Sequence, residues 1–152
     1  MNTNYDKIKS DLLDFGKRNG ACIGQYQRLY KAESIEDIIS VVKDNFKWCI
    51  QYKDFADVLM ANREQFAEHQ IWINQNVEIQ EGVGFLLVTE GSINAESYGA
   101  STINAKSCDT STMIIRTLNI ECEVNDRSIA RYIYDNRIVI ADTSVTVEQY
   151  HK

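Results

Sequence analysis

Proline is absent from this 152-residue chain, and no apolar run approaches the length of a membrane span. A helix that crosses a bilayer needs about 20 consecutive apolar residues. Residues 1–14 alternate polar and apolar side chains and lack the unbroken apolar centre of a signal peptide. We therefore expect a soluble, cytoplasmic protein that has no membrane partner.

The chain also lacks a strong excess of charge of either sign. Its formal net charge is −6; residues 1–79 hold 10 Lys/Arg and 12 Asp/Glu, and residues 80–152 hold 6 and 10. Such a mildly acidic chain has no bulk attraction to a phosphate backbone. We expect no nucleic-acid partner.

Cysteines are few and far apart, and no two of them form a C-x-x-C pair. They are Cys22, Cys49, Cys108 and Cys122. A disulfide-stabilised domain is usually shorter and richer in cysteine. We expect reduced thiols that serve as small buried apolar residues.

Side chains that commonly carry catalysis are scarce. There are two histidines, His69 and the penultimate His151. A general base formed by His69 beside Glu68 is one interpretation; a histidine hydrogen-bonded to the backbone, where helices give way to strands, is the favoured one. A zinc site needs three or four closely spaced ligands, and Gly82-x-Gly84 does not open a helix as a phosphate-binding loop would. We predict no catalytic residues, no metal site and no cofactor.

The first half of the sequence follows the period of an α-helix. Ser34 and Asp37 fit an acidic version of a capping box, and Asn62 is expected to cap a later turn. Three apolar stripes have helical spacing. They are Ile8, Leu12 and Phe15; Ile23, Tyr26, Leu29 and Tyr30; and Ile35, Ile38, Ile39, Val42, Phe46 and Cys49. These stripes predict a series of short helices.

The second half follows the period of a β-strand and contains an internal repeat. Ser92–Ser97 (SINAES) returns ten residues later as Thr102–Ser107 (TINAKS) and again as 112–117. Short β units at a constant step are typical of structures in which each unit buries its apolar row against the next. We predict an α+β fold in which residues 1–79 form a helical region with a short extended junction and residues 80–152 form a β-solenoid-like repeat region. An antiparallel meander or sandwich is the alternative.

Strand alternation divides the repeats into two faces. The inward side chains are expected to be Ile93, Ala95, Ile103, Ala105, Met113 and Ile115. If consecutive repeats stack, the outward side chains form polar columns, with Asn94 beside Asn104 and Glu96 beside Lys106 and Arg116. These five residues are the candidate surface for a partner or a polar ligand. The alternative is a solvated ladder that adds a fraction of a kcal/mol to stability.

Four short segments occur in an order that suggests a family resemblance. They are Gly20-Ala21-Cys22, Ser34-Ile35-Glu36-Asp37-Ile38, Trp48-Cys49-Ile50 and Glu68-His69-Gln70-Ile71-Trp72. Followed by short β repeats, this order resembles small uncharacterised proteins of gut Bacteroidetes and their prophages, built from a helical head and a β-repeat tail. The resemblance implies a mobile-element context and supplies no catalytic residues.

These observations favour a non-enzymatic protein-binding or assembly module that presents a β-repeat face or end. The alternative is a phage or prophage accessory factor that sequesters a host defence protein or a small signalling ligand. The partner is expected to be another protein or a second copy of the chain. Self-association is predicted through the last β segment, residues 145–152, since a lightly charged open sheet edge tends to pair.

Overall fold

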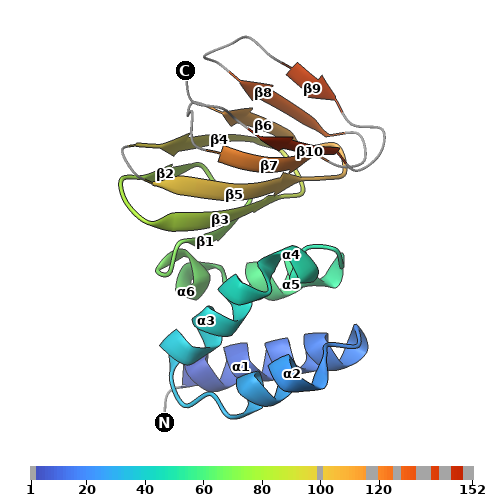
Figure 1. The fold of residues 1–152 in the computed structure, drawn as a ribbon, viewed down its shortest axis with the longest axis vertical. Helices are drawn as coiled ribbons and strands as arrows, with labels where there is room; N and C mark the ends of the chain where they lie inside the picture. Colours follow the sequence, from blue (N-terminus) through green and yellow to red (C-terminus); the bar gives the residue numbers. More distant parts are fainter. Residues whose placement is uncertain are drawn as a thin grey trace. The chain divides into compact units, whose positions relative to one another are not determined.

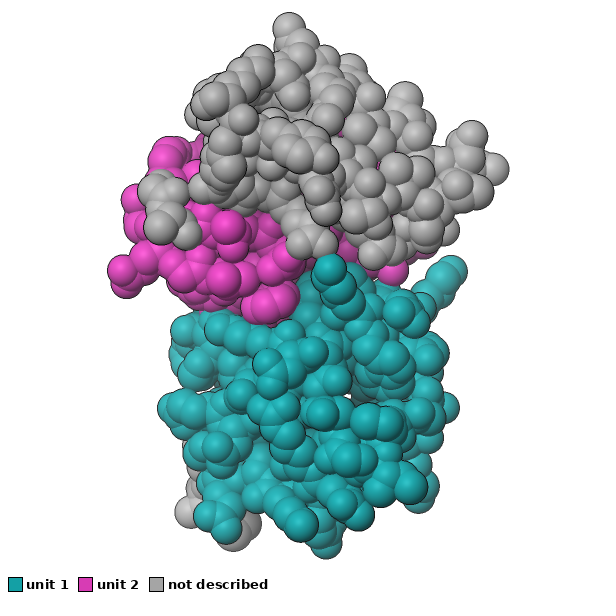
Figure 2. Space-filling view, in the orientation of Figure 1, with its two compact units in different colours: residues 1–69 teal, residues 70–152 magenta. Residues whose placement is uncertain are grey.

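The computed structural model describes residues 3–98, 101–115, 120–124, 128–132, 138–140 and 145–148. The chain divides into two compact units, residues 1–69 and residues 70–152 (Figures 1 and 2). Residues 71–79, expected as an extended junction at the end of the helical region, form two strands of the second unit. The first unit is helical and the second is built from strands.

The predicted amino-terminal helical region is confirmed. Its helices are α1 (Thr3–Arg18), α2 (Ile23–Tyr30), α3 (Ile35–Asp44), α4 (Phe46–Cys49), α5 (Asp54–Ala61) and α6 (Arg63–Ala67). Gly20 has a φ of +70°, a left-handed conformation that glycine adopts readily, and it follows the end of α1. Asn45 separates α3 from α4, so the long third stripe is divided between two helices.

The start of α3 has the predicted cap. The Ser34 hydroxyl accepts a hydrogen bond from the Asp37 backbone N–H at 3.1 Å. The Asp37 carboxylate in turn accepts from the Glu33 backbone N–H, also at 3.1 Å. Such a cap satisfies N–H groups that have no partner within the helix, and losing a serine cap typically costs about 1 kcal/mol.

Aromatic rings fill the core of the helical unit. The ring of Phe15 lies 5.7 Å from that of Trp48, 6.2 Å from that of Tyr52 and 5.2 Å from that of Phe55, measured between centroids. Phe46 meets Phe55 at 6.1 Å. Edge-to-face pairs at such separations add to the gain from burying the rings. The core therefore ties α1 to α4 and α5.

The second unit consists of two five-stranded sheets, whose strands alternate along the chain. One sheet has the order β1-β3-β5-β7-β10 and the other β2-β4-β6-β8-β9 (Figure 1). The strands are β1 (Ile71–Ile73), β2 (Val77–Ile79), β3 (Val83–Val88), β4 (Ser92–Ser97), β5 (Thr102–Ser107), β6 (Thr112–Ile115), β7 (Ile120–Val124), β8 (Ile129–Tyr132), β9 (Ile138–Ile140) and β10 (Val145–Glu148). Pairing is parallel from β1 to β7 and from β2 to β8.

The predicted fold class is therefore wrong for the second half. We expected a β-solenoid-like stack, or else an antiparallel meander or sandwich, and the strands instead form two parallel sheets. Consecutive repeats do not pair: β4 pairs with β6 and β5 pairs with β3 and β7. The error has a physical cause, since a ten-residue period marks one strand and one corner and does not specify which strand is the neighbour.

The ten-residue period of the sequence is explained by equivalent turns, or corners, before β5 and β6. The Ser101 hydroxyl donates to the Ile79 carbonyl at 3.1 Å, and ten residues later the Ser111 hydroxyl donates to the Val88 carbonyl at 3.1 Å. Both serines are completely buried. Gly91, with a φ of +75°, precedes β4 in a conformation that favours glycine. The same two carbonyls also accept backbone N–H hydrogen bonds, from Tyr98 at 3.0 Å and from Cys108 at 2.9 Å, so both corners pair their buried polar groups in the same way.

The predicted inward faces are confirmed. Side chains of both sheets form one apolar core, and it includes all six residues expected to point inward: Ile93, Ala95, Ile103, Ala105, Met113 and Ile115. Strand alternation alone located them correctly, because the side-chain period of a strand does not depend on which strand lies next to it.

The carboxyl-terminal strands fold back onto the sheets. β10 pairs antiparallel with β7, and β9 pairs antiparallel with β8. Residues 145–148, expected to provide an open edge for self-association, pair with β7 and form the edge strand of their sheet, so self-association through this edge stays a prediction; residues 149–152 lie outside the described residues. The edges of β7 and β8 that parallel pairing leaves open are thereby occupied.

Candidate functional site

The candidate site lies in the helical unit, where α2 is held against α1 and α3. Polar contacts at the end of α1 fix one wall: the Asn19 amide donates to the Asp54 carboxylate at 2.9 Å, and Arg18 forms an ion pair with the same carboxylate at 3.1 Å. On the other side, Arg28 of α2 pairs with Asp44 of α3 at 2.7 Å and donates to the Ser40 hydroxyl at 2.9 Å. These polar contacts thus tie the end of α1 to α5 and tie α2 to α3.

A cavity of about 190 Å³ lies among α1, α2, α3 and α4. Its walls are mainly apolar and aromatic, with Leu12, Phe15, Leu29, Val42 and Trp48 among them. An apolar cavity of about 150 Å³ accommodates benzene, whereas pockets for drug-sized ligands start at about 300 Å³. The cavity therefore has room for one ring or one bulky side chain, and is too small for a nucleotide or an organic cofactor.

Two amide side chains give the cavity a polar wall. Asn45 Nδ2 donates to Gln25 Oε1 at 3.0 Å and to the Val41 carbonyl at 2.8 Å. Arg28 also lies 3.4 Å from Gln25 Oε1. These contacts fix both amides, yet Gln25 Nε2 and Asn45 Oδ1 have no hydrogen bond within the described part of the chain. A donor and an acceptor are therefore free at the lining of an apolar hollow, as in many ligand pockets.

Two cysteines line the same cavity and differ in environment. Cys22 is exposed at the start of α2, and Cys49 is buried. Burial raises the pKa of the Cys49 thiol to about 12. Because the thiolate is the nucleophilic form, Cys49 is inert at neutral pH. The expectation of small buried thiols holds for Cys49 and not for Cys22.

A shallow groove of about 570 Å³ adjoins the cavity along the outer side of α2. Gly16, Ala21 and Tyr26 line both the groove and the cavity. On the groove side, Ile23 is 76% exposed and Tyr30 is 65% exposed, whereas Leu29 is 7% exposed. Half of the predicted α2 stripe thus faces outward. The stripe itself was the signal that could have revealed this surface, because Leu29 and Tyr30 are adjacent and lie on different faces of an eight-residue helix.

The residues predicted as a binding surface do not form the expected columns. Asn94 and Glu96 lie on β4, whereas Asn104 and Lys106 lie on β5, which belongs to the other sheet. Arg116 lies outside the described residues. In register, Asn94 is paired with Ile114 and Asn104 with Phe85 and Glu121.

Two of the predicted site residues, Glu96 and Lys106, also have local surroundings that differ from those predicted. The Glu96 carboxylate accepts a hydrogen bond from the Tyr98 hydroxyl at 2.5 Å and is paired in register with Glu78, not with a cation. Lys106 is 7% exposed and lies in register between Leu87 and Glu123. Neither residue belongs to a flat, mixed-charge docking face of the kind predicted.

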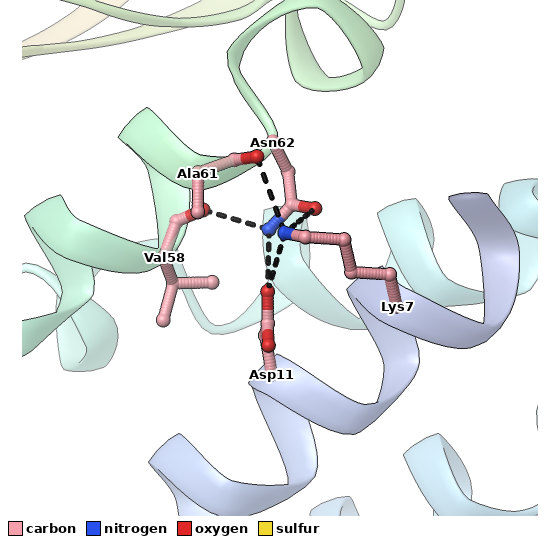
Figure 3. A network of polar contacts seen from close by, with 5 residues as sticks. All are labelled: Lys7, Asp11, Val58, Ala61 and Asn62. Carbon is pink, nitrogen blue, oxygen red and sulfur yellow. Dashed lines mark hydrogen bonds and ion pairs between the residues drawn. The ribbon is translucent and has the colours of Figure 1, made fainter. Parts of the chain in front are cut away.

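A polar cluster between α1 and α5 is structural in character (Figure 3). Asn62, which is 2% exposed, donates to the Asp11 carboxylate at 3.0 Å and to the Val58 carbonyl at 2.9 Å. Lys7 donates to Asn62 Oδ1 at 3.0 Å and pairs with Asp11 at 3.1 Å. Asn62 was expected to cap α6; its side chain makes no capping hydrogen bond and joins two helices instead.

The electrostatics of this cluster disfavour catalysis by Asp11. Burial raises the pKa of Asp11, but hydrogen bonds from Asn62 and Lys7, together with the charges of Lys7 and Arg18, bring it below the ordinary value of 3.8. A carboxylate held in its charged form in this way is a weak general base at neutral pH. His69 lies at the end of the helical unit, where its backbone N–H donates to the Phe66 carbonyl at 3.0 Å.

Comparison of the chain with protein-family models, with curated proteins and with solved structures yields no match. Within the described ranges, no helix has the length and apolar character needed to cross a bilayer. Nor does that part of the chain contain a group of three or more His, Cys, Asp or Glu side chains placed to hold a metal ion.

Proposed function

We propose that the protein is a non-enzymatic protein-binding module whose helical unit receives an apolar anchor side chain of its partner. The observation that carries this proposal is that the cavity and the open groove adjoin and share Gly16, Ala21 and Tyr26 in their linings. Interfaces commonly bury an aromatic or aliphatic anchor in a pocket and surround it with shallower contacts.

The size of the cavity supports this proposal over an enzymatic function. A space of about 190 Å³ receives a single side chain but not a typical substrate with its catalytic groups. The alternative, in which the chain sequesters a small ligand, would use the cavity alone and leave the exposed Ile23 and Tyr30 without a role. The proposal includes a cytoplasmic location, which the free thiols of Cys22, Cys49 and Cys108 favour.

The test uses indole as a probe for an aromatic anchor. We expect indole titrated into the ¹⁵N-labelled protein to shift the amide resonances of Gly16 and Ala21 and the side-chain N–H of Trp48, in a saturable manner. Ala21→Phe, which places a ring at the lining, should abolish these shifts, whereas Ala56→Phe, outside both linings, should leave them unchanged. Absence of saturable shifts in the wild-type protein, or equal shifts in Ala21→Phe, would contradict the proposal.

A further inference from the structure

The segment that supplies most of the groove lining is basic in a chain that is acidic overall. Residues 17–32 contain four Lys/Arg and no Asp/Glu, although the formal net charge of the chain is −6. This segment includes the end of α1, the connecting turn and all of α2. Lys17 lines the groove itself, and no carboxylate does.

Two of these four cations are already neutralised within the helical unit. Arg18 pairs with Asp54 and Arg28 pairs with Asp44. Lys17 and Lys31 form no ion pair within the part of the chain that the structure describes. The nearest carboxylates in the sequence, Asp14 and Glu33, are not part of the groove lining.

A third lysine approaches the groove from α1. Lys9 Nζ lies 5.9 Å from the centre of the Tyr30 ring and donates to the Ala32 carbonyl at 2.8 Å. Ile23, Tyr26 and Tyr30 form an apolar strip of the groove: Lys17 lines the same groove, Lys9 contacts the Tyr30 ring, and Lys31 follows Tyr30 in the chain. Charges of one sign around an apolar strip select a partner with charges of the other sign, which speeds encounter and excludes basic partners.

We propose that the groove binds a protein segment in which acidic residues flank one aromatic or aliphatic anchor; this inference rests on the proposed function. The anchor enters the cavity beyond Tyr26, and the flanking carboxylates face Lys17 and Lys31. The hollow favours a protein segment over an anionic membrane, because a bilayer surface cannot fill a recessed cavity of side-chain size.

The experiment is a selection of binders from a randomised 12-residue peptide library, performed with the full chain. We expect the selected peptides to share one Phe, Trp, Leu or Met with Asp or Glu within one helical turn on either side. Selection on a Lys17→Glu/Lys31→Glu variant should lose that acidic enrichment. A consensus without acidic residues, an unchanged consensus on the variant, or failure to select any peptide would overturn the inference.

Matched peptides then separate this inference from the proposed function. One selected peptide is compared with its Glu→Gln form by fluorescence anisotropy, and we expect the Gln form to bind roughly 2- to 30-fold more weakly, since it loses two exposed ion pairs. The difference should shrink at high salt. Equal affinity of the two forms, with both lost in Ala21→Phe, would retain the anchor and overturn the acidic partner. Binding that persists in Ala21→Phe would place the peptide elsewhere and overturn both.

Two further arms test other occupants of the groove. Vesicles of phosphatidylserine and phosphatidylcholine should not bind the protein; binding that Ile23→Ser abolishes would assign the groove to a membrane. Sedimentation equilibrium should show no association that Tyr30→Ser weakens; such an association would assign the groove to a second copy of the chain. Either result would overturn the inference.

Discussion

The β unit uses the same hydrogen bonds and the same kind of core residue at successive repeats, whereas the helical unit does not. In the β unit, equivalent serines satisfy equivalent carbonyls at successive corners, and small and branched apolar residues recur at the same inward positions. In the helical unit, the core depends on single aromatic residues such as Phe15 and Trp48, and a cavity is left beside them. The repeat is the more conspicuous feature of the sequence, yet the cavity described above lies in the other unit.

This difference shows what repetition records. A side chain that recurs at the same position of each repeat makes the same packing contact each time, so the repeat is explained by the stability of the unit. An apolar side chain that is largely exposed, such as Ile23, contributes little to the core of its own unit. The candidate for function is therefore better sought among residues that the fold does not use.

The largest expected effect tests the core of the β unit. Ile103 is completely buried between the two sheets, so Ile103→Asp places an unpaired charge there and should lower the free energy of unfolding by about 3–5 kcal/mol. Thr102→Asp, one position earlier and exposed, should change it by less than about 0.5 kcal/mol. Urea unfolding in a Trp48→Phe background, where Trp72 fluorescence reports on the β unit, measures both. Similar losses in the two variants would contradict the inward assignment.

How much of this could be read from the sequence differs between the units. Strand alternation located inward residues such as Met113, and the Ser34–Asp37 pair located a helix start, because both are local patterns. Which strand neighbours which is decided by the corners, and nothing in the SINAES and TINAKS repeats distinguishes pairing with the next strand from pairing with the one after it. For the same reason the predicted Glu96–Lys106 column was wrong.

The cavity was beyond sequence analysis for a different reason. Gly16 and Asn45 are far apart in the sequence and line the same cavity only because α2 packs against both α1 and α3. The spacing of the α2 stripe indicates that Leu29 and Tyr30 lie on different faces, but the position of the neighbouring helices decides that Leu29 is covered and Tyr30 is exposed. Tertiary packing supplies that information.

The next largest effect comes from the same substitution made in each unit. At Gly84 of β3, an added Cβ would lie 2.6 Å from Trp72 Cζ3, too close for a carbon contact. Gly84→Ala should therefore lower the stability of the β unit by about 1–3 kcal/mol. Gly24 of α2 has open space around its Cβ position, and Gly24→Ala should raise the stability of the helical unit by about 0.5–1 kcal/mol, because alanine favours the helix. Trp72 fluorescence in a Trp48→Phe background measures the stability of the β unit, and Trp48 fluorescence in a Trp72→Phe background measures that of the helical unit. Stability changes of the same sign in the two units would contradict the packing described.

A smaller effect is expected from the polar cluster between α1 and α5. Asn62→Ala removes the donor to Asp11 and to the Val58 carbonyl and should cost about 1 kcal/mol, near the lower end for such a loss, because Asp11 and Lys7 can turn to water. Lys7→Ala should cost less, since its ion pair is largely exposed. Trp48 fluorescence in a Trp72→Phe background during urea unfolding measures both, and a larger loss for Lys7→Ala would reverse our ranking of the contacts.

The smallest effect concerns the pH dependence of the helical unit. Burial raises the pKa of Asp11, but hydrogen bonds from Asn62 and Lys7 bring it below 3.8; hydrogen bonds from the Glu33 backbone N–H and from Ser34 lower the pKa of Asp37. Both carboxyls bind a proton less readily in the folded chain than in the unfolded chain. Their contribution to stability is therefore complete above the ordinary value of 3.8 and is lost as the pH falls through the lowered folded values.

Urea midpoints of the helical unit should accordingly decrease as the pH falls below about 4. Asp11→Asn and Asp37→Asn each keep an oxygen that accepts the same hydrogen bond and cannot titrate, so each variant should show a smaller decrease than the wild-type chain. Combining them should reduce it further, because the two sites share no hydrogen-bond partner and their effects should add. The two variants also separate the network between helices from the cap of a single helix. A midpoint that rises on acidification, or a wild-type decrease that both variants retain in full, would show that these two carboxylates do not control the acid stability of the helical unit.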